Sequence, residues 1–371
     1  MLPDLRHLPV QAPRPDCGAL IDHLLGKRQL PSPPLIEFIV DDPVIRVVVE
    51  DLLGRQWVDY GPERESQRRY LDNLIEFWRS LGYDFVRFER GLPFPGTGLH
   101  TQNTAPGATG DRGWVDESHG GINTWEDFER YPFPKIEDFD FYPFEYLNSH
   151  LPEGTGLIAG HGGGFFEHLS WTFSIEQLCL ALYDNPTLVE ATMQRIGEPI
   201  LAVLRQLAQL DRVAALFPGD DLGFRTGTLI SPANIRRLVL PWHQQAAEIA
   251  HRRGIPYFLH SCGNLVKIMD DLIDVVRIDG KHSYEDAILP VAQFQERYGQ
   301  RVAVLGGLDV HALSTGTPES VRELTRAVIA ACGPRGRYAV GSGNSIPDYV
   351  PVANYLSMVD ETLEQAHRSA S

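Results

Sequence analysis

The pattern His260-Ser261-Cys262 has the residue types and the spacing of a metal-binding pair. A short apolar run, 256–260, predicts a strand that ends at the histidine. Because side chains alternate along a strand, those of His260 and Cys262 lie on the same side and can reach one ion. Zinc accepts mixed nitrogen and sulfur ligands. The spacing therefore predicts a zinc site, and the alternative is a buried histidine packed beside a small cysteine.

A third protein ligand for such an ion must come from elsewhere in the chain. Cys332 ends the helix before the last predicted strand, and Cys179 lies in an amphipathic helix, so we expect both to be structural. An oxygen or nitrogen ligand is favoured instead. The candidates are Glu167, Asp220, Asp221, Asp279, His282 and the turn 342–344.

Two adjacent carboxylates, Asp220 and Asp221, follow the apolar run 213–218. One of them could orient a ligand histidine or hold a substrate amine. The alternative is that they cap the helix that begins near Ser231. That helix has its own start signal, Ser231-Pro232, so a functional role for the two aspartates is favoured.

The elements that would position these groups are short apolar runs that alternate with amphipathic helical stretches. The predicted strands are 35–40, 84–88, 156–160, 213–218, 256–260, 275–278, 302–305 and 338–341. Eight strands with intervening helices predict a single (β/α)8 TIM barrel, with an open doubly wound sheet as the alternative. We expect residues 1–33 to form an N-terminal arm and residues 34–371 to form the barrel. Residues 91–155 are expected to form a long loop insert after the second strand, which is either functional or a brace.

A barrel of this kind gathers its catalytic groups at the carboxyl ends of the strands, where this chain is markedly polar. The glycines after His161 are expected to let the backbone approach a ligand or to make a turn. We expect catalytic roles for Asp220, Asp221, Asp279 and His282. The expected substrate-binding residues are Glu37, His161, Glu167, Arg225 and Asn344.

Composition limits the classes of partner. The 371 residues carry 33 Lys and Arg against 49 Asp and Glu, a net charge of −16, which disfavours nucleic acid. No apolar run approaches the roughly 20 residues that cross a bilayer. The first twenty residues lack the apolar centre of a secretory signal, and the four scattered cysteines fit a reducing compartment. We therefore expect a cytoplasmic protein with no membrane partner.

Several motifs, taken in order, resemble the uroporphyrinogen decarboxylase superfamily. The resemblance covers about residues 34–367 and is strongest from residue 156 onward. It rests on Gly219-Asp-Asp-Leu-Gly, Phe258-Leu-His-Ser-Cys-Gly, Ile278-Asp-Gly-Lys-His, Leu305-Gly-Gly-Leu-Asp and Gly341-Ser-Gly-Asn. The resemblance implies a (β/α)8 barrel, in agreement with the strand count, and it implies two chemistries.

One chemistry is that of the zinc-dependent methylcobalamin:coenzyme M methyltransferases of this superfamily. The resemblance implies that a His-x-Cys pair and a later cysteine bind zinc, which activates a thiol to attack a methyl group carried on cobalt. His260 and Cys262 match the pair. Ser342 and Asn344 occupy the segment where the later cysteine would fall, and Ser342 is the implied third metal-binding position.

The other chemistry is decarboxylation of a porphyrinogen. The resemblance implies an arginine-rich segment near the amino terminus that grips the acidic side chains of the tetrapyrrole, and an aspartate that binds its pyrrole NH groups. Here the early segment 35–42 is acidic, and the second strand ends Phe88-Glu89-Arg90 without that aspartate. A multiply anionic substrate would meet the wrong charge, so methyl transfer is favoured.

The leading hypothesis is a cytoplasmic, corrinoid-linked, zinc-dependent methyltransferase that acts on a small thiol or a similar acceptor. Methylcobalamin or another corrinoid would be the co-substrate, and a corrinoid protein and a second copy of the chain are the expected partners. A cofactor-free decarboxylase that uses Arg225 or Arg90 as a carboxylate clamp is the first alternative. A corrinoid- or tetrapyrrole-binding protein is the second.

Overall fold

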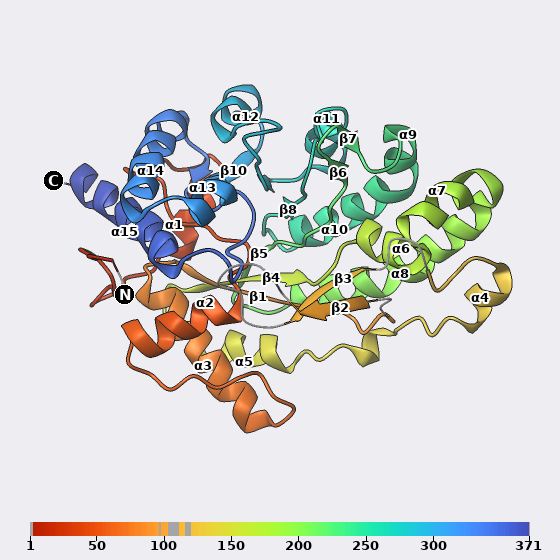
Figure 1. Ribbon diagram of the computed structural model, residues 1–371, viewed down its shortest axis with the longest axis horizontal. Coiled ribbons are helices and arrows are strands. Elements are labelled where there is room, and N and C mark those ends of the chain that lie inside the picture. Colours follow the sequence, from red (N-terminus) through yellow and green to blue (C-terminus); the bar gives the residue numbers. More distant parts are fainter. Residues whose placement is uncertain (1–2, 96–97, 103–110, 116–119, 371) are drawn as a thin grey trace.

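Two parallel sheets form the centre of the molecule. The structure is a computed structural model that describes residues 3–95, 98–102, 111–115 and 120–370. One sheet has the order β1-β4-β5 and the other the order β11-β10-β9-β8, and every pair is parallel. The strands are β1 (Phe85–Arg90), β4 (Gly156–His161), β5 (Val213–Leu216), β8 (Phe258–His260), β9 (Gly280–His282), β10 (Ala303–Leu305) and β11 (Tyr338–Ala339). The result is a mixed α/β fold with helices around the strands (Figure 1).

Isolated parallel bridges join the two sheets into one series of segments. Leu216 pairs with Tyr257 and Gly219 pairs with His260, which places β5 beside β8. The segment 35–40 pairs with residues 340 and 346, beyond β11. Eight parallel segments therefore follow one another in the order 35–40, β11, β10, β9, β8, β5, β4 and β1. Among the described residues no backbone pairing joins the first of these segments to the last.

The helices begin and end near the predicted positions. Four expected helices are confirmed. The expected helix 19–25 is α1 (Cys17–Leu24), and 66–81 is α3 (Arg64–Ser80). The expected helix 232–253 is the segment α9 to α10 (Pro232–Arg252), and 318–331 is α14 (Pro318–Cys332). The start of α14 illustrates the local cause: the Thr317 hydroxyl accepts from the Ser320 amide, and Pro318 occupies the first turn. Further helices are α2 (Asp42–Val47), α6 (Phe165–Phe173), α7 (Ile175–Asp184), α8 (Pro186–Leu207), α12 (Val291–Tyr298), α13 (Val310–Thr315) and α15 (Val352–Ala370).

One predicted strand is misplaced. Residues 275–278 were expected to be extended, but Leu272–Val276 is a π-helical turn that continues α11 (Met269–Asp271). Arg277 ends this turn with a left-handed backbone, φ 66°. The strand, β9, begins only at Gly280, so Asp279 precedes the strand instead of following it. An apolar run of this length does not by itself distinguish a buried strand from a buried helix.

The insert 91–155 is not the irregular loop system that we expected. It contains the antiparallel hairpin β2 (Gly98–Gln102) and β3 (Asp111–Val115), and the helices α4 (Trp125–Arg130) and α5 (Tyr142–His150). The N-terminal residues contact the last helix: the amides of Arg6 and His7 donate to the Asp360 carboxylate of α15. The two ends of the chain accordingly lie on the same side of Figure 1. None of the described helices is long and apolar enough to cross a membrane.

Candidate metal centre

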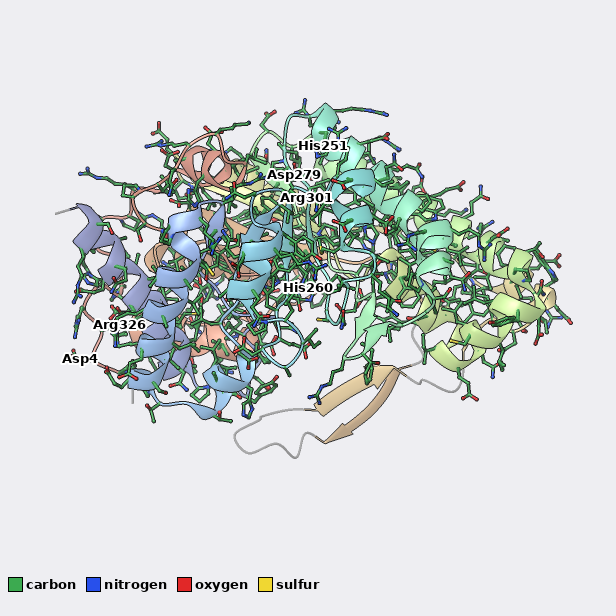
Figure 2. The ribbon with its side chains drawn as sticks, turned by 90° about the horizontal axis from the view of Figure 1, so that it is seen from above. Asp4, His251, His260, Asp279, Arg301 and Arg326 are labelled. Carbon is green, nitrogen blue, oxygen red and sulfur yellow. The ribbon has the colours of Figure 1, made fainter. Side chains whose placement is uncertain are left out.

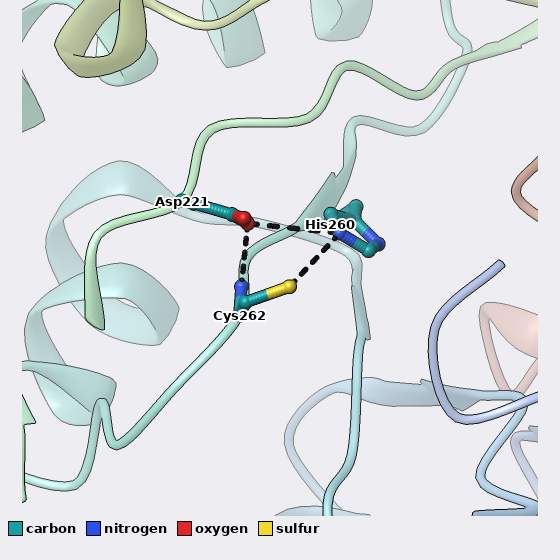
Figure 3. Close-up of side chains that lie close together, drawn as sticks. All are labelled: Asp221, His260 and Cys262. Carbon is teal, nitrogen blue, oxygen red and sulfur yellow. Dashed lines mark hydrogen bonds and ion pairs between the residues drawn. The ribbon is translucent and has the colours of Figure 1, made fainter. Parts of the chain in front are cut away.

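The carboxyl ends of β5 and β8 bring three potential metal ligands together: Asp221, His260 and Cys262 (Figure 3). His260 Nε2 lies 3.4 Å from Cys262 Sγ and 3.6 Å from Asp221 Oδ1. The Cys262 amide also donates to Asp221 Oδ1 at 2.8 Å, which holds the carboxylate against the strand end. The pairing of Gly219 with His260 explains this meeting, because it places the chain after β5 directly beside the end of β8.

These separations fit one tetrahedral zinc ion. With Zn–N and Zn–O distances of about 2.0–2.1 Å and a Zn–S distance of about 2.3 Å, two ligand atoms lie about 3.3–3.6 Å apart. The two measured separations from His260 Nε2 fall in this range. A nitrogen, a sulfur and an oxygen ligand would leave the fourth position open, which is typical of catalytic zinc sites.

Hydrogen bonds fix which nitrogen of His260 is free. His282 Nε2 lies 3.2 Å from the carbonyl oxygen of Ser342, which can only accept, so this nitrogen must carry a proton. His282 Nδ1 is then an acceptor, and it lies 2.7 Å from His260 Nδ1. His260 Nδ1 therefore donates, and the lone pair of His260 Nε2 is directed to Cys262 and Asp221. His282 thus positions a metal ligand.

The ring of His260 is held by packing as well. Phe38 stacks on it with ring centroids 4.1 Å apart and an interplanar angle of 9°. Burial and the neighbouring His282 hold the pKa of His260 well below its ordinary value of 6.5. The imidazole is consequently neutral at physiological pH, which is the form that binds a metal. Phe38 was not among the predicted site residues, because only the pairing across the sheet places it there.

Ser342 does not serve as the third metal ligand that the resemblance implied. Its hydroxyl donates to Glu37 Oε1 at 2.7 Å and its amide donates to Glu37 Oε2 at 3.0 Å. Glu37, which we expected to bind substrate, is fully buried, and these bonds occupy both of its carboxylate oxygens. Burial raises the pKa of Glu37 to about 7 despite the three hydrogen bonds that it accepts. The pair instead supports the carbonyl oxygen of Ser342 that holds His282.

Two side chains donate to the sulfur of Cys262. Asn344 Nδ2 lies 3.2 Å from Sγ, which places this predicted substrate-binding residue at the centre. Ser283 Oγ lies 3.4 Å from Sγ and was not predicted. Ser283 has a left-handed backbone, φ 84°, which a residue other than glycine adopts only when its surroundings hold it there. Its position directly after His282 was the only feature of the sequence that indicated a place for Ser283 at the metal centre.

The acid–base properties of the centre favour a protonated Cys262 thiol until a cation enters. Burial, and next the charge of Asp221, raise the pKa of the Cys262 thiol to about 12. Burial also raises the pKa of Asp221. A bound divalent cation reverses this preference because it stabilises the thiolate and the carboxylate.

Asp220 has a different environment from its neighbour. Its carboxylate accepts from the amides of Phe166 and Glu167 in the first turn of α6, and Oδ2 lies 2.8 Å from His243 Nε2. It is fully buried, so the expected catalytic role is replaced by a structural one. Gly164 makes this possible, because a Cβ there would lie 2.2 Å from the Asp220 side chain. The glycine run after His161 therefore serves a turn and a close backbone approach.

His161, which we expected to bind substrate, is held by the backbone. Its Nδ1 bonds to the carbonyl oxygen of Gly163 at 2.9 Å, and its Nε2 accepts from the amide of Leu92 at 3.0 Å. Both ring nitrogens are satisfied by the backbone and the residue is fully buried. Glu167 accepts from the Gly164 amide. Burial, with the charges of nearby Asp220 and Asp221, raises the pKa of Glu167 well above its ordinary value.

Two predicted residues lie away from the centre. Asp279 binds His251 Nε2 at 2.7 Å and the Tyr257 amide at 2.8 Å, both at the amino end of the strands. Figure 2 shows Asp279 beside His251 and apart from His260. The shifted start of β9 is the physical reason. Arg225 is exposed at the tip of the hairpin formed by β6 (Gly223–Phe224) and β7 (Gly227–Thr228). Among the described residues, Arg225 forms no hydrogen bond or ion pair with a residue of the metal centre.

A cavity of about 510 Å3 adjoins the centre between the segment 38–42 and the end of β1. Phe38 separates it from His260. Carboxylates predominate among its charged groups: Asp41, Asp42, Asp59 and Glu89 against Arg87 and Arg90. Arg87 is buried and paired with Glu89 at 2.5 Å, so the remaining lining is acidic. The cavity is large enough for part of a substrate or cofactor.

Fold and site together define a class: α/β proteins whose parallel strands carry a His, Cys and Asp cluster at their carboxyl ends. The sequence model of the family described as uroporphyrinogen decarboxylase (URO-D) matches residues 120–365, which include all three cluster residues. The chain belongs to this family. No curated protein sequence matches it significantly.

Solved structures share the fold at low sequence identity. A methyltransferase from Methanosarcina mazei is 15% identical with a TM-score of 0.65, and the match covers 96% of this chain and 100% of that chain. A putative vitamin-B12-independent methionine synthase from Listeria monocytogenes is 13% identical with a TM-score of 0.48, covering 92% of this chain and 99% of that chain. The first likeness identifies the fold.

Proposed function

We propose that this protein is a zinc-dependent, corrinoid-linked methyltransferase that activates a small thiol or a similar acceptor at the carboxyl ends of its strands. The observation that carries this proposal is the meeting of Asp221, His260 and Cys262, with His260 Nε2 left free by the bond to His282. Family membership and the shared fold with a methyltransferase support it.

The proposal includes a closed (β/α)8 barrel. The eight parallel segments would close if the segment 35–40 packs against β1. Side-chain contacts support this closure: the Arg87 guanidinium of β1 lies 5.0 Å from the centroid of the Phe38 ring, and Phe38 contacts Phe217 with centroids 5.0 Å apart. Closure would place the metal centre and the acidic cavity in one mouth.

Zinc, when bound, would supply positive charge that lowers the pKa of an acceptor thiol and so provides a nucleophile at neutral pH. Asp221, His260 and Cys262 would hold the ion, and His282 would keep His260 in the binding tautomer. Asn344 donates to Cys262 Sγ and restrains that sulfur. Burial and the nearby carboxylates raise the pKa of Glu167 well above its ordinary value, and Glu167 is the proposed group for proton exchange with the acceptor.

The two substrates supply all the atoms and electrons that the proposed reaction requires. The acceptor thiol loses its proton, its sulfur bonds to the methyl group, and the electron pair of the broken methyl–cobalt bond stays with cobalt. The cavity beside Phe38 would receive part of the corrinoid, either free or presented by a corrinoid protein. Its acidic lining suits a neutral or cationic ligand better than a polyanion.

The direct test is metal analysis joined to a methyl-transfer assay. We expect one zinc per chain after purification without chelator, and loss of the methylcobalamin absorbance when 2-mercaptoethanesulfonate is added. Cys262→Ser should lose both, whereas Cys179→Ser, a change at an exposed cysteine of α7, should keep both. Absence of a bound transition metal together with full activity of Cys262→Ser would overturn the proposal.

Decarboxylation of a tetrapyrrole is a second candidate because the matching family carries that name. Arg90, which lines the cavity, would be its carboxylate clamp. Release of carbon dioxide from a porphyrinogen by metal-free protein would establish it. Binding of a corrinoid or porphyrin without turnover of either would instead indicate a carrier protein.

A further inference from the structure

A second cavity lies beside β9, between the segment that follows β8 and the helices α11 and α12. Its volume is about 30 Å3, the space of two or three water molecules. Its lining is largely apolar and includes Leu265, Val266, Met269, Ile288, Leu289 and Phe294. Because side chains alternate along β9, His282 faces His260 while Lys281 faces this cavity.

Lys281 is a buried cation in this apolar lining, with only 4% of its surface exposed. Its ammonium donates to the carbonyl oxygen of Ser283 and lies 4.4 Å from the centroid of the Tyr284 ring. Phe294 provides a second ring face at 5.6 Å. An ammonium has three N–H donors, and among the described residues Ser283 is the one oxygen that accepts from it.

No carboxylate among the described residues forms an ion pair with Lys281. Glu285 lines the same cavity, but it is exposed and lies beyond ion-pair distance. Burial of an unpaired ammonium is costly, and it lowers the pKa of Lys281 to about 8. The protein therefore holds a positive charge with unused donors beside apolar side chains, an arrangement that suits a ligand with one anionic and one apolar end.

We propose that this cavity binds a small monocarboxylate of about one to three carbon atoms, whose carboxylate accepts hydrogen bonds from Lys281. The alkyl group would pack on Met269 and Phe294. The cavity volume sets the upper limit, because a longer chain would have to displace tightly packed side chains. This inference does not depend on the methyltransferase proposal, since Asp221, His260 and Cys262 do not line the cavity, although Ser283 borders both sites.

Titration calorimetry of the full chain with formate, acetate, propionate and hexanoate at constant ionic strength tests the proposal. We expect saturable binding of acetate or propionate, and binding of hexanoate at least about tenfold weaker. Lys281→Met, which keeps the side-chain length and removes the charge, should weaken acetate binding at least about tenfold. Lys267→Met, at an exposed lysine outside the cavity, is the matched control and should bind as the wild type does.

A second variant locates the ligand without altering the buried lysine. Glu285→Gln removes an exposed negative charge at the cavity and should tighten acetate binding about two- to fivefold. If Lys281→Met does not fold, this variant decides the question: tighter binding supports the proposal, and unchanged or weaker binding overturns it. The proposal is also overturned if the wild type shows no saturable binding, if chloride competes as well as propionate, or if folded Lys281→Met binds acetate normally.

Discussion

His282→Phe should separate the positioning of a metal ligand from ligation itself. Phenylalanine fills much of the same volume but removes the acceptor that lies 2.7 Å from His260 Nδ1. The buried N–H of His260 then lacks a partner, which costs about 1–3 kcal/mol. His260 can avoid that cost by changing tautomer or turning its ring, and either change misdirects Nε2. We expect zinc affinity to fall about 10–100-fold, the usual effect of losing such a support.

The assay is competitive titration of zinc against a chromophoric chelator, with the melting temperature of the metal-free protein as a measure of folding. His282→Gln keeps an acceptor and should lose less affinity than His282→Phe. His251→Gln changes a histidine that binds Asp279 far from the centre and should leave zinc affinity unchanged. Folded His282→Phe protein with wild-type zinc affinity would refute the assignment of the His260 tautomer.

Three other predictions concern the same region. Since the pKa of Cys262 is raised to about 12, the thiol is protonated at neutral pH. Zinc binding should therefore release one proton, and zinc affinity should rise about tenfold per pH unit between about pH 6 and pH 9. Calorimetry in buffers of different ionisation enthalpy counts that proton, and a count near zero contradicts ligation by Cys262. Asp220→Ala removes two helix-capping bonds and the partner of His243, and should lower the free energy of unfolding by about 2–4 kcal/mol in urea titrations. Gly164→Ala places a Cβ 2.2 Å from Asp220 and should destabilise the protein by about 1–3 kcal/mol, whereas Gly227→Ala, with open space around it, should not.

The sequence was sufficient for the part of the site that lies on one strand. Alternation along 258–262 predicts that His260 and Cys262 share a side, and the structure places Nε2 and Sγ 3.4 Å apart. The third ligand could not be ranked, because its place depends on the pairing of β5 with β8. Asp220 and Asp221 have the same side chain, and it is the first turn of α6 and His243 that bind Asp220 while Asp221 is left beside His260.

The errors have physical causes of the same kind. Asp279 was placed at the wrong end of its strand because a π-helical turn occupies the apolar run that resembled the strand. Ser342 and Asn344 both face inward by alternation, but the buried carboxylate of Glu37 takes the Ser342 hydroxyl and leaves Asn344 beside Cys262. His161 was expected to bind substrate because of its place at a strand end, whereas backbone groups of Gly163 and the distant Leu92 bind both of its ring nitrogens. Residue spacing along one strand predicts which side chains share a side of that strand. It does not predict which hydrogen-bond partners other strands and helices supply.

Asp220 and Asp221 are adjacent in sequence, so a single peptide unit connects the residue that binds α6 to the residue that faces the metal centre. One carboxylate anchors the first turn of α6, and the next faces His260. A shift of that helix is thus transmitted directly to the ion-binding side chain, with no intervening residue to absorb it. Remote substitutions that move α6 should consequently alter metal retention, even though they touch none of the three donor atoms.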